Sequence, residues 1–241
     1  MLRIKLFQVN PLGTNSLVLW EDAARADAGA PLPCALVDPG YYRPDEEEMV
    51  LSFLRDNGLR PDAILLTHVH FDHTWGVASM ARRFACPVYL SAADEPVLRA
   101  GARMLERLHL DKTVEPFDYK DIADGQTLLA GGACWQVLAT PGHSPGSVCY
   151  YCADSSVLLS GDTLFAGSIG RTDLEGGDYD ALMQSILEKL MVLPGETDVV
   201  PGHGHPTTIA HESTSNPFLL PFNEPDPDWG NQQGLGLNGI Q

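Results

Sequence analysis

Three histidines and one aspartate fall within six consecutive residues of this chain. Residues 68–73 read His-Val-His-Phe-Asp-His and come one residue, Thr67, after the apolar run 63–66. The run predicts a buried strand, on which residues two apart point to the same side, so His68 and His70 can hold one ion. Asp72 and His73 begin a helical pattern and are expected to turn toward a neighbouring position. Four ligand-type residues at this spacing indicate a metal site.

Three further motifs each place one ligand-type residue in a glycine-containing turn after a short apolar run. His143 lies in Pro-Gly-His-Ser, Asp162 in Ser-Gly-Asp-Thr and His203 in Pro-Gly-His-Gly. Histidine and carboxylate ligands suit zinc, iron and manganese. Together with the first cluster the chain offers seven ligands, which are too many for one four- or five-coordinate ion.

These motifs, in this order, resemble those of the metallo-β-lactamase-fold superfamily, and the resemblance runs from residue 1 to about residue 220. It implies an α+β fold, a four-layer αββα sandwich whose site lies in the groove between two sheets. It also implies two divalent metal ions per chain, zinc ahead of iron or manganese, with Asp162 bridging them. The first ion would be bound by His68, His70, His143 and Asp162. The second would be bound by Asp72, His73, Asp162 and His203.

The rest of the chain alternates strand-like and helix-like segments in two halves. We expect strands at 2–9, 16–20, 35–38, 63–66 and 88–90, and then at 127–129, 135–139, 148–151, 157–159 and 198–200. Helices are expected at 44–57, 74–84, 93–108, 179–191 and 207–214. From residue 221 the composition shifts to proline, aspartate, glycine and asparagine with little periodicity. We therefore expect one domain over residues 1–222 and a flexible tail over 223–241.

Composition limits the partners. A net charge of −17 argues against a nucleic-acid partner, which would need a basic face. No apolar run approaches the ~18 residues that cross a membrane.

The five cysteines are scattered, and Cys149 and Cys152, three apart on a predicted strand, face opposite sides. We expect both in the core rather than in a redox or zinc pair, and the protein in the cytoplasm; the oligomeric state is left open.

Two motifs resemble other catalytic signatures but lack what those signatures need. Residues 142–146, Gly-His-Ser-Pro-Gly, match a serine-hydrolase elbow, but Pro145 has no N–H to offer an oxyanion hole after Ser144. Residues 234–239 match a dinucleotide fingerprint, but too few residues follow to form a helix that could bind a pyrophosphate.

Four other polar residues could in principle bind the metals or contact their ligands. His109 and His211 are expected to be structural, and His205 a bystander, because His203 already completes the ligand set. Asp38, in Val-Asp-Pro-Gly, is either a turn residue or the carboxylate that accepts the other N–H of a ligand histidine.

Residues 161–173 narrow the choice within the superfamily. They read Gly-Asp-Thr-Leu-Phe-Ala-Gly-Ser-Ile-Gly-Arg-Thr-Asp and resemble the glyoxalase II (hydroxyacylglutathione hydrolase) branch, as do residues 207–209 and 212–218. Metallo-β-lactamases commonly carry cysteine at the position of Asp162, and flavodiiron proteins carry a carboxylate at the position of His70. The resemblance is closest to the short bacterial type, which lacks the C-terminal helical domain that binds glutathione.

This branch implies a dinuclear metallo-hydrolase that cleaves small-molecule S-acyl thioesters of the S-lactoylglutathione type. Two cations that share an oxygen lower the pKa of bound water, and the resulting hydroxide attacks the thioester carbonyl. Asp72 would orient the hydroxide and take its proton, while Arg171, with Gly170, would bind the substrate. A thiolate leaves without a general acid, because its conjugate acid has a pKa of about 8.5.

Three alternatives remain open from the sequence. A mononuclear-iron persulfide dioxygenase would use His68, His143 and Asp162 as a facial triad with open positions. A lactonase would act on another ester at the same site. A non-catalytic, metal-free scaffold is disfavoured, because nothing structural requires all seven ligands.

Overall fold

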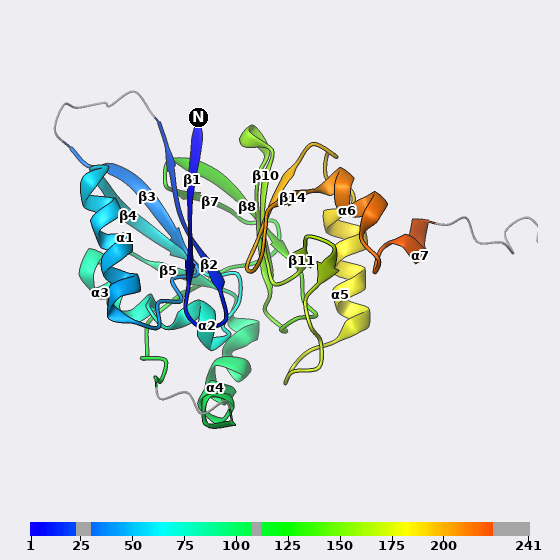
Figure 1. The fold of residues 1–241 in the computed structure, drawn as a ribbon, viewed down its shortest axis with the longest axis horizontal. Helices are drawn as coiled ribbons and strands as arrows, with labels where there is room; N and C mark the ends of the chain where they lie inside the picture. Colours follow the sequence, from blue (N-terminus) through cyan, green and yellow to red (C-terminus); the bar gives the residue numbers. More distant parts are fainter. Residues whose placement is uncertain (23–29, 108–111, 224–241) are drawn as a thin grey trace, which may run out of the picture.

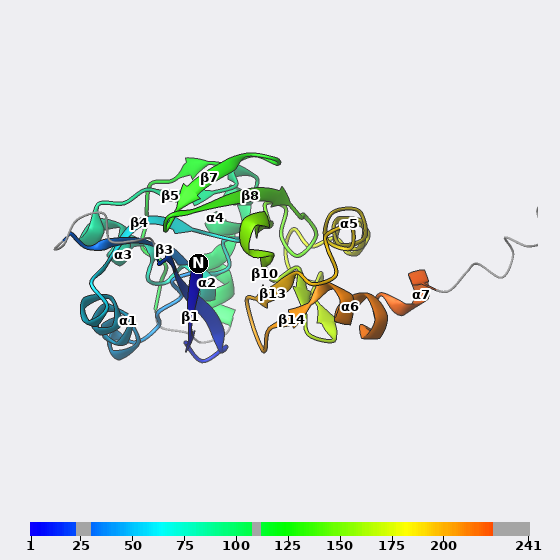
Figure 2. The same cartoon turned by 90° about the horizontal axis from the view of Figure 1, so that it is seen from above.

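The computed structural model describes residues 1–22, 30–107 and 112–223. Two mixed sheets pack face to face, and helices cover the outer face of each sheet (Figure 1). The view from above shows the same four layers (Figure 2). The expected α+β sandwich of αββα type is therefore confirmed.

The first sheet has the strand order β1 (Leu2–Val9), β2 (Thr14–Glu21), β3 (Leu32–Val37), β4 (Leu59–Leu65), β5 (Val88–Leu90) and β6 (Lys120–Asp121). Strands β1 to β3 pair antiparallel, and β3 to β6 pair parallel. The parallel connections run through α1 (Pro44–Asp56), then α2 (Phe71–Thr74) and α3 (Val77–Phe84), then α4 (Glu95–Arg107).

The second sheet has the order β14 (Thr207–Thr208), β13 (Asp198–Pro201), β10 (Val157–Gly161), β9 (Val148–Cys152), β8 (Ala133–Ala139) and β7 (Thr127–Ala130). Only the β10–β13 pair is parallel among its described strands. Helix α5 (Tyr179–Ser185), extended by a π-helical turn to Leu190, makes that connection, and α6 (Ile209–Ser215) and α7 (Leu220–Asn223) follow β14. A small hairpin, β11 (Leu164–Phe165) and β12 (Ser168–Ile169), precedes α5.

Alternate side chains of each strand enter different layers of the core, as the period of two requires. Leu36 packs in the layer between the first sheet and its helices, whereas its neighbour Val37 packs between the two sheets. On β9, Cys149 faces the layer of α5 and Cys152 faces the layer between the sheets. The prediction that these cysteines are separate core residues is confirmed.

The prediction of one helix over 74–84 was wrong in one respect, because the structure divides this segment at Trp75 and Gly76. The Gly76 N–H donates to the carbonyl oxygen of Pro39 at 2.7 Å, and a side chain at Gly76 would collide with that oxygen and with Tyr41. This close approach fixes α2, the short helix that carries Asp72 and His73, against the loop after β3.

Other differences lie at element ends. Thr207 and Thr208 form β14, and the last expected helix begins at Ile209, with the Thr208 side chain as its N-cap. Strand β6, the β11–β12 hairpin and α7 were not predicted. The proposed tail lies outside the described residues except for Asn223, which ends α7. No helix in the described ranges is long and apolar enough to cross a membrane.

Candidate metal centre

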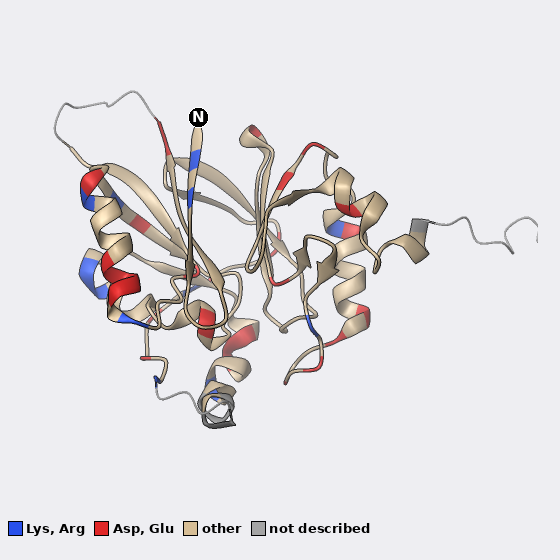
Figure 3. Ribbon diagram, viewed as in Figure 1, with Lys and Arg blue, Asp and Glu red and all other residues tan. Residues whose placement is uncertain are grey.

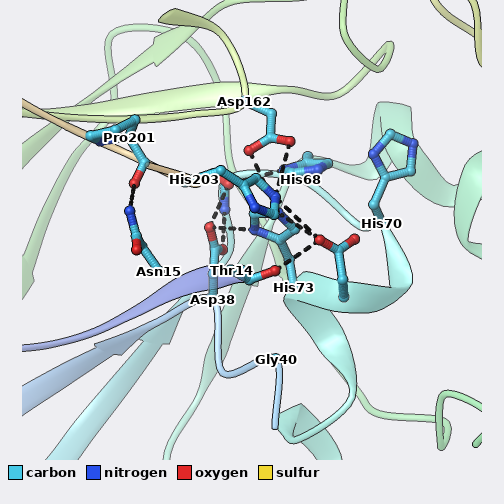
Figure 4. Close-up of polar contacts among 12 residues, drawn as sticks. Thr14, Asn15, Asp38, Gly40, His68, His70, His73, Asp162, Pro201 and His203 are labelled. Carbon is cyan, nitrogen blue, oxygen red and sulfur yellow. Dashed lines mark hydrogen bonds and ion pairs between the residues drawn. The ribbon is translucent and has the colours of Figure 1, made fainter. Parts of the chain in front are cut away.

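The predicted ligands converge from both sheets on one site, although they come from five separate loops or short helices. His68 and His70 follow β4, Asp72 and His73 lie in α2, His143 follows β8, Asp162 follows β10 and His203 follows β13. Figure 4 shows His68, His70, His73, Asp162 and His203 of this set side by side. Strand ends that meet at one edge of two facing sheets explain how residues so distant in sequence come together.

The first group of ligand atoms belongs to His68, His70 and His143, all of which are buried. Their ligand atoms lie within 4.8 Å of one another. The closest pair is His70 Nδ1 and His143 Nε2, at 2.8 Å. Three imidazoles at this separation form the N-donor set that a transition-metal cation binds.

The second group belongs to Asp72, His73 and His203. His73 Nε2 lies 3.3 Å from His203 Nε2 and 3.4 Å from Asp72 Oδ2. His203 Nε2 lies 3.3 Å from the same carboxylate oxygen. One carboxylate and two imidazole nitrogens therefore face a common point.

Asp162 lies between the two groups. Its Oδ2 is 3.5 Å from His143 Nε2 of the first group and 3.6 Å from His203 Nε2 of the second. Its Oδ1 is 3.5 Å from His73 Nε2. This is the position that a bridging carboxylate requires.

The donor atoms fit bound cations. His68 Nε2 and Asp162 Oδ1 are buried and have no hydrogen-bond partner in the described part of the chain. A buried polar atom without a partner costs free energy, and a cation would remove that cost. The histidine and carboxylate set is the one that zinc, iron or manganese would take.

In three of the ligand histidines, the ring nitrogen that points away from the centre is held by an oxygen. His143 Nδ1 donates to the carbonyl oxygen of Arg171 at 2.8 Å, and His203 Nδ1 donates to that of Leu12 at 3.2 Å. His73 Nδ1 donates to Asp38 Oδ2 at 3.0 Å. A proton on Nδ1 leaves Nε2 with a free lone pair, which is the tautomer that binds a cation at Nε2.

Asp38 connects both groups. Besides His73, it accepts hydrogen bonds from the backbone N–H of Thr67 at 2.9 Å and from the Thr67 hydroxyl at 2.6 Å. That hydroxyl in turn accepts from His68 Nδ1 at 3.0 Å. Of the two roles expected for Asp38, its position in the structure therefore matches the carboxylate that accepts the other N–H of a ligand histidine.

The local electrostatics favour cations. Burial, followed by the neighbouring His143, lowers the pKa of His70 to about 3, so its imidazole is neutral at neutral pH. Burial also opposes a charge on His73, but the carboxylates of Asp72, Asp162 and Asp38 outweigh it and raise its pKa to about 10. The second group is therefore an environment in which positive charge is stabilised.

Two glycines allow the close approach of these loops. A methyl group at Gly202 would collide with Asp162 Oδ1 and lie 2.9 Å from the His73 ring. A methyl group at Gly170, predicted to bind substrate, would collide with the carbonyl oxygen of Asp162. The structure thus gives Gly170 a place beside the candidate bridging ligand.

Arg171 lies next to the first group through its backbone, and its side chain is exposed. The guanidinium makes a two-point ion pair with Asp173, with Nε and Nη2 at 2.7 and 2.8 Å from the carboxylate oxygens. That ion pair lowers the pKa of Asp173 to about 2. The predicted substrate-binding group thus has a carboxylate partner within the chain.

Sequence reasoning did not single out Asp94, which ties the first group together. Its buried carboxylate accepts hydrogen bonds from Val69 N–H at 3.1 Å, the Ser144 hydroxyl at 2.9 Å and Gly146 N–H at 2.6 Å. Val69 lies between His68 and His70, and Ser144 follows His143, so one carboxylate fixes two ligand loops. A polar residue just after the predicted strand at 88–90 was the only signal in the sequence.

The residues that were not expected to be ligands or catalytic groups are absent from the ligand groups described above. Ser144 is buried, and its hydroxyl is engaged by Asp94 and Ser147, which does not suit a nucleophile. His205 is exposed and belongs to none of the ligand groups found among the described residues. His211 is exposed on α6. His109 and residues 234–239 lie outside the described residues.

Comparison with known proteins agrees with this arrangement. The sequence model of the metallo-β-lactamase superfamily matches residues 11–203. The chain is 42% identical over 193 residues to the probable metallo-hydrolase YqgX of Bacillus subtilis, covering 78% of this chain and 88% of that protein. It is 31% identical over 221 residues to the hydroxyacylglutathione hydrolase GloC of Haemophilus influenzae, covering 90% and 98%.

Two solved structures are similar over most of the chain. The B3 metallo-β-lactamase BLEG-1 superposes with a TM-score of 0.76 at 39% identity, covering 90% of this chain and 99% of that one. TTHA1623, solved in a di-iron-bound form, superposes with a TM-score of 0.76 at 38% identity, covering 89% and 100%.

Proposed function

The chain belongs to the metallo-β-lactamase superfamily, and we propose that it is a dinuclear metallo-hydrolase that cleaves S-acyl thioesters of the S-lactoylglutathione type. The observation that carries the proposal is the pair of ligand groups with Asp162 between them. The relatives named as metallo-hydrolases support an enzyme, and the di-iron form of TTHA1623 supports two ions.

In this proposal His68, His70 and His143 would hold one cation, and Asp72, His73 and His203 would hold the other. Asp162 would be a ligand shared by the two groups. Zinc is the proposed metal, and iron is the alternative that TTHA1623 supports. When bound, such cations lower the pKa of a water molecule and polarise a carbonyl oxygen.

Asp72 is the proposed proton acceptor. Burial would raise the pKa of its carboxyl, but His73 and His203 hold that pKa well below its usual range, so the carboxylate is ionised at neutral pH. The contacts from Thr14, His73 and His203 converge on Oδ2. Oδ1 is then the oxygen proposed to orient the attacking water and take its proton.

A thioester suits the residues around this site. A thiolate leaves readily, because its conjugate acid has a pKa of about 8.5. Ser144, the hydroxyl nearest to His143 in sequence, is already committed to Asp94 and Ser147. The reaction therefore needs no dedicated acid, and GloC, described as a hydroxyacylglutathione hydrolase, supports the same substrate class.

Arg171 is proposed to bind a remote carboxylate of the substrate. Its charge contributes to the low pKa of His70, so the guanidinium lies within electrostatic reach of the first group. In the part of the chain that the structure describes, Lys and Arg are scattered among Asp and Glu (Figure 3). With a net charge of −17, an anionic substrate needs a local cation, and it can take the place of Asp173 on Arg171.

A β-lactam is the second candidate substrate, because BLEG-1 is described as a B3 metallo-β-lactamase. An amide nitrogen is a poorer leaving group than a thiolate and requires a proton as it departs. The thioester is therefore preferred.

We also propose a cytoplasmic location, because all five cysteines are free thiols.

The test is a set of assays on the purified, metal-loaded protein. S-lactoylglutathione should release free thiol without oxygen uptake, while a chromogenic cephalosporin should be cleaved slowly or not at all. Rapid cephalosporin cleavage without thioester cleavage would show that the substrate is a β-lactam and not a thioester. Persulfide-dependent oxygen uptake without thioester cleavage would favour the dioxygenase, and activity on lactones alone would favour a lactonase.

A further inference from the structure

The loop between β1 and β2 lies against the second ligand group, a contact that no motif in the sequence indicates. The Leu12 carbonyl oxygen accepts from His203 Nδ1 at 3.2 Å, and Asn10 Nδ2 donates to the backbone oxygen of Asp72 at 2.9 Å. Asn15 N–H donates to the carbonyl oxygen of Gly202 at 2.7 Å. Its side-chain amide donates to the carbonyl oxygen of Pro201 (Figure 4) and to that of Gly204.

Thr14 is the residue of this loop region that reaches a ligand side chain directly. It is fully buried, and its hydroxyl donates to Asp72 Oδ2 at 2.8 Å. The alternative acceptor, Asn10 Oδ1, is farther away at 3.4 Å and carries no charge, so the proton lies on the bond to the carboxylate. The backbone of Thr14 also forms a β-bridge with His203.

We propose that Thr14 is a positioning residue for the second cation, acting by holding the Asp72 carboxylate in the orientation in which it binds. This inference rests on the dinuclear site of the proposed function. Thr14 contacts one ligand through its side chain and a second through its backbone. Among the described residues the Thr14 hydroxyl contacts Asp72 and Asn10 and no member of the first group, so its effect should be confined to the second ion.

Rotation of the Asp72 carboxylate about its terminal torsion decides where its two oxygens point. That torsion is broad in free side chains, and only one range of it directs Oδ2 toward both His73 and His203. A charge-assisted hydrogen bond from a buried hydroxyl selects that range and leaves Oδ1 for the reacting water. Loss of such an outer partner of a metal ligand typically costs about 10- to 100-fold in metal affinity or activity.

The test compares three variants of the full-length protein. Thr14→Val removes the hydroxyl but keeps the shape of the side chain, and Thr14→Ser keeps the hydroxyl. Thr197→Val is the matched control, because Thr197 is also fully buried and its hydroxyl has no hydrogen-bond partner among the described residues. Zinc affinity is measured by competition with a chromophoric chelator, bound zinc by elemental analysis, and folding by circular dichroism and Tm.

We expect Thr14→Val to bind the first zinc as the wild type does and the second about 10- to 100-fold more weakly. Thr14→Ser should recover most of that affinity, and Thr197→Val should match the wild type. Two zinc ions bound by Thr14→Val with wild-type affinity would overturn the proposal. So would an equal loss at both sites that serine does not rescue, because that is the signature of a general structural defect. A wild-type protein that binds no more than one zinc would instead overturn the dinuclear site itself.

Discussion

Replacing Asp38 with asparagine should destabilise the protein and loosen both metal sites. The carboxylate accepts hydrogen bonds from Thr67 N–H, the Thr67 hydroxyl and His73 Nδ1, at 2.9, 2.6 and 3.0 Å. Asparagine can keep one oxygen toward Thr67 N–H, but its amide NH₂ then faces two donors. At least one buried donor is left unpaired, which costs about 1–3 kcal/mol, and the remaining bonds lose the charge of the acceptor.

Together these losses amount to about 3 kcal/mol of unfolding free energy. For a chain of this size, about 2–4 °C per kcal/mol converts this into a fall in Tm of about 6–12 °C. Because Asp38 holds His73 directly and His68 through Thr67, binding of both ions should weaken, by about 10- to 100-fold.

The assay is calorimetry or circular dichroism in excess chelator, together with zinc titration of the same samples. Asp154→Asn is the control, because Asp154 is an exposed carboxylate. Its Tm and zinc affinity should match those of the wild type. A Tm within about 2 °C of the wild type for Asp38→Asn, combined with unchanged zinc affinity, would show that Asp38 is only a turn residue and would refute the reasoning.

Three further predictions use the same site and the core. Asp162→Ala should lower the affinity for both ions, whereas His203→Ala should mainly empty the second site; equal metal loss in the two variants would contradict the assigned positions. Arg171→Ala should raise KM for S-lactoylglutathione more than it lowers kcat, and Asp72→Ala should do the reverse, as steady-state kinetics would show. Burial raises the pKa of the Cys149 thiol to about 11, so iodoacetamide at pH 8 should label the exposed Cys134 quickly and Cys149 only after denaturation. Rapid labelling of Cys149 in the folded protein, read by peptide mass spectrometry, would argue against the packed layer around β9.

The sequence predicted those parts of the fold that depend on local patterns. The apolar run 63–66 lies just before the ligand motif, and the structure shows that strand entering the first sheet with the expected alternation of faces. Periodicity could not predict the break at Gly76, because helical spacing continues across it, while the cause is a contact with the Pro39 carbonyl oxygen on another loop.

The outer contacts of the candidate site were beyond sequence reasoning for the same physical reason. Thr14 meets Asp72 across 58 positions, and Asp94 meets Ser144 across 50. A threonine at the start of a strand and an aspartate after one are common in turns and caps. Nothing in their spacing distinguishes them until the two sheets bring the loops together.

The proposed site needs two bound cations and takes a thioester as its substrate. Thiol release from S-lactoylglutathione, followed while chelator-stripped protein is titrated with zinc, tests both statements. Activity should appear with added zinc, rise until two equivalents per chain are bound, and then level off. Saturation at one equivalent would contradict the dinuclear site, and no thiol release at full metal loading would contradict the thioester substrate.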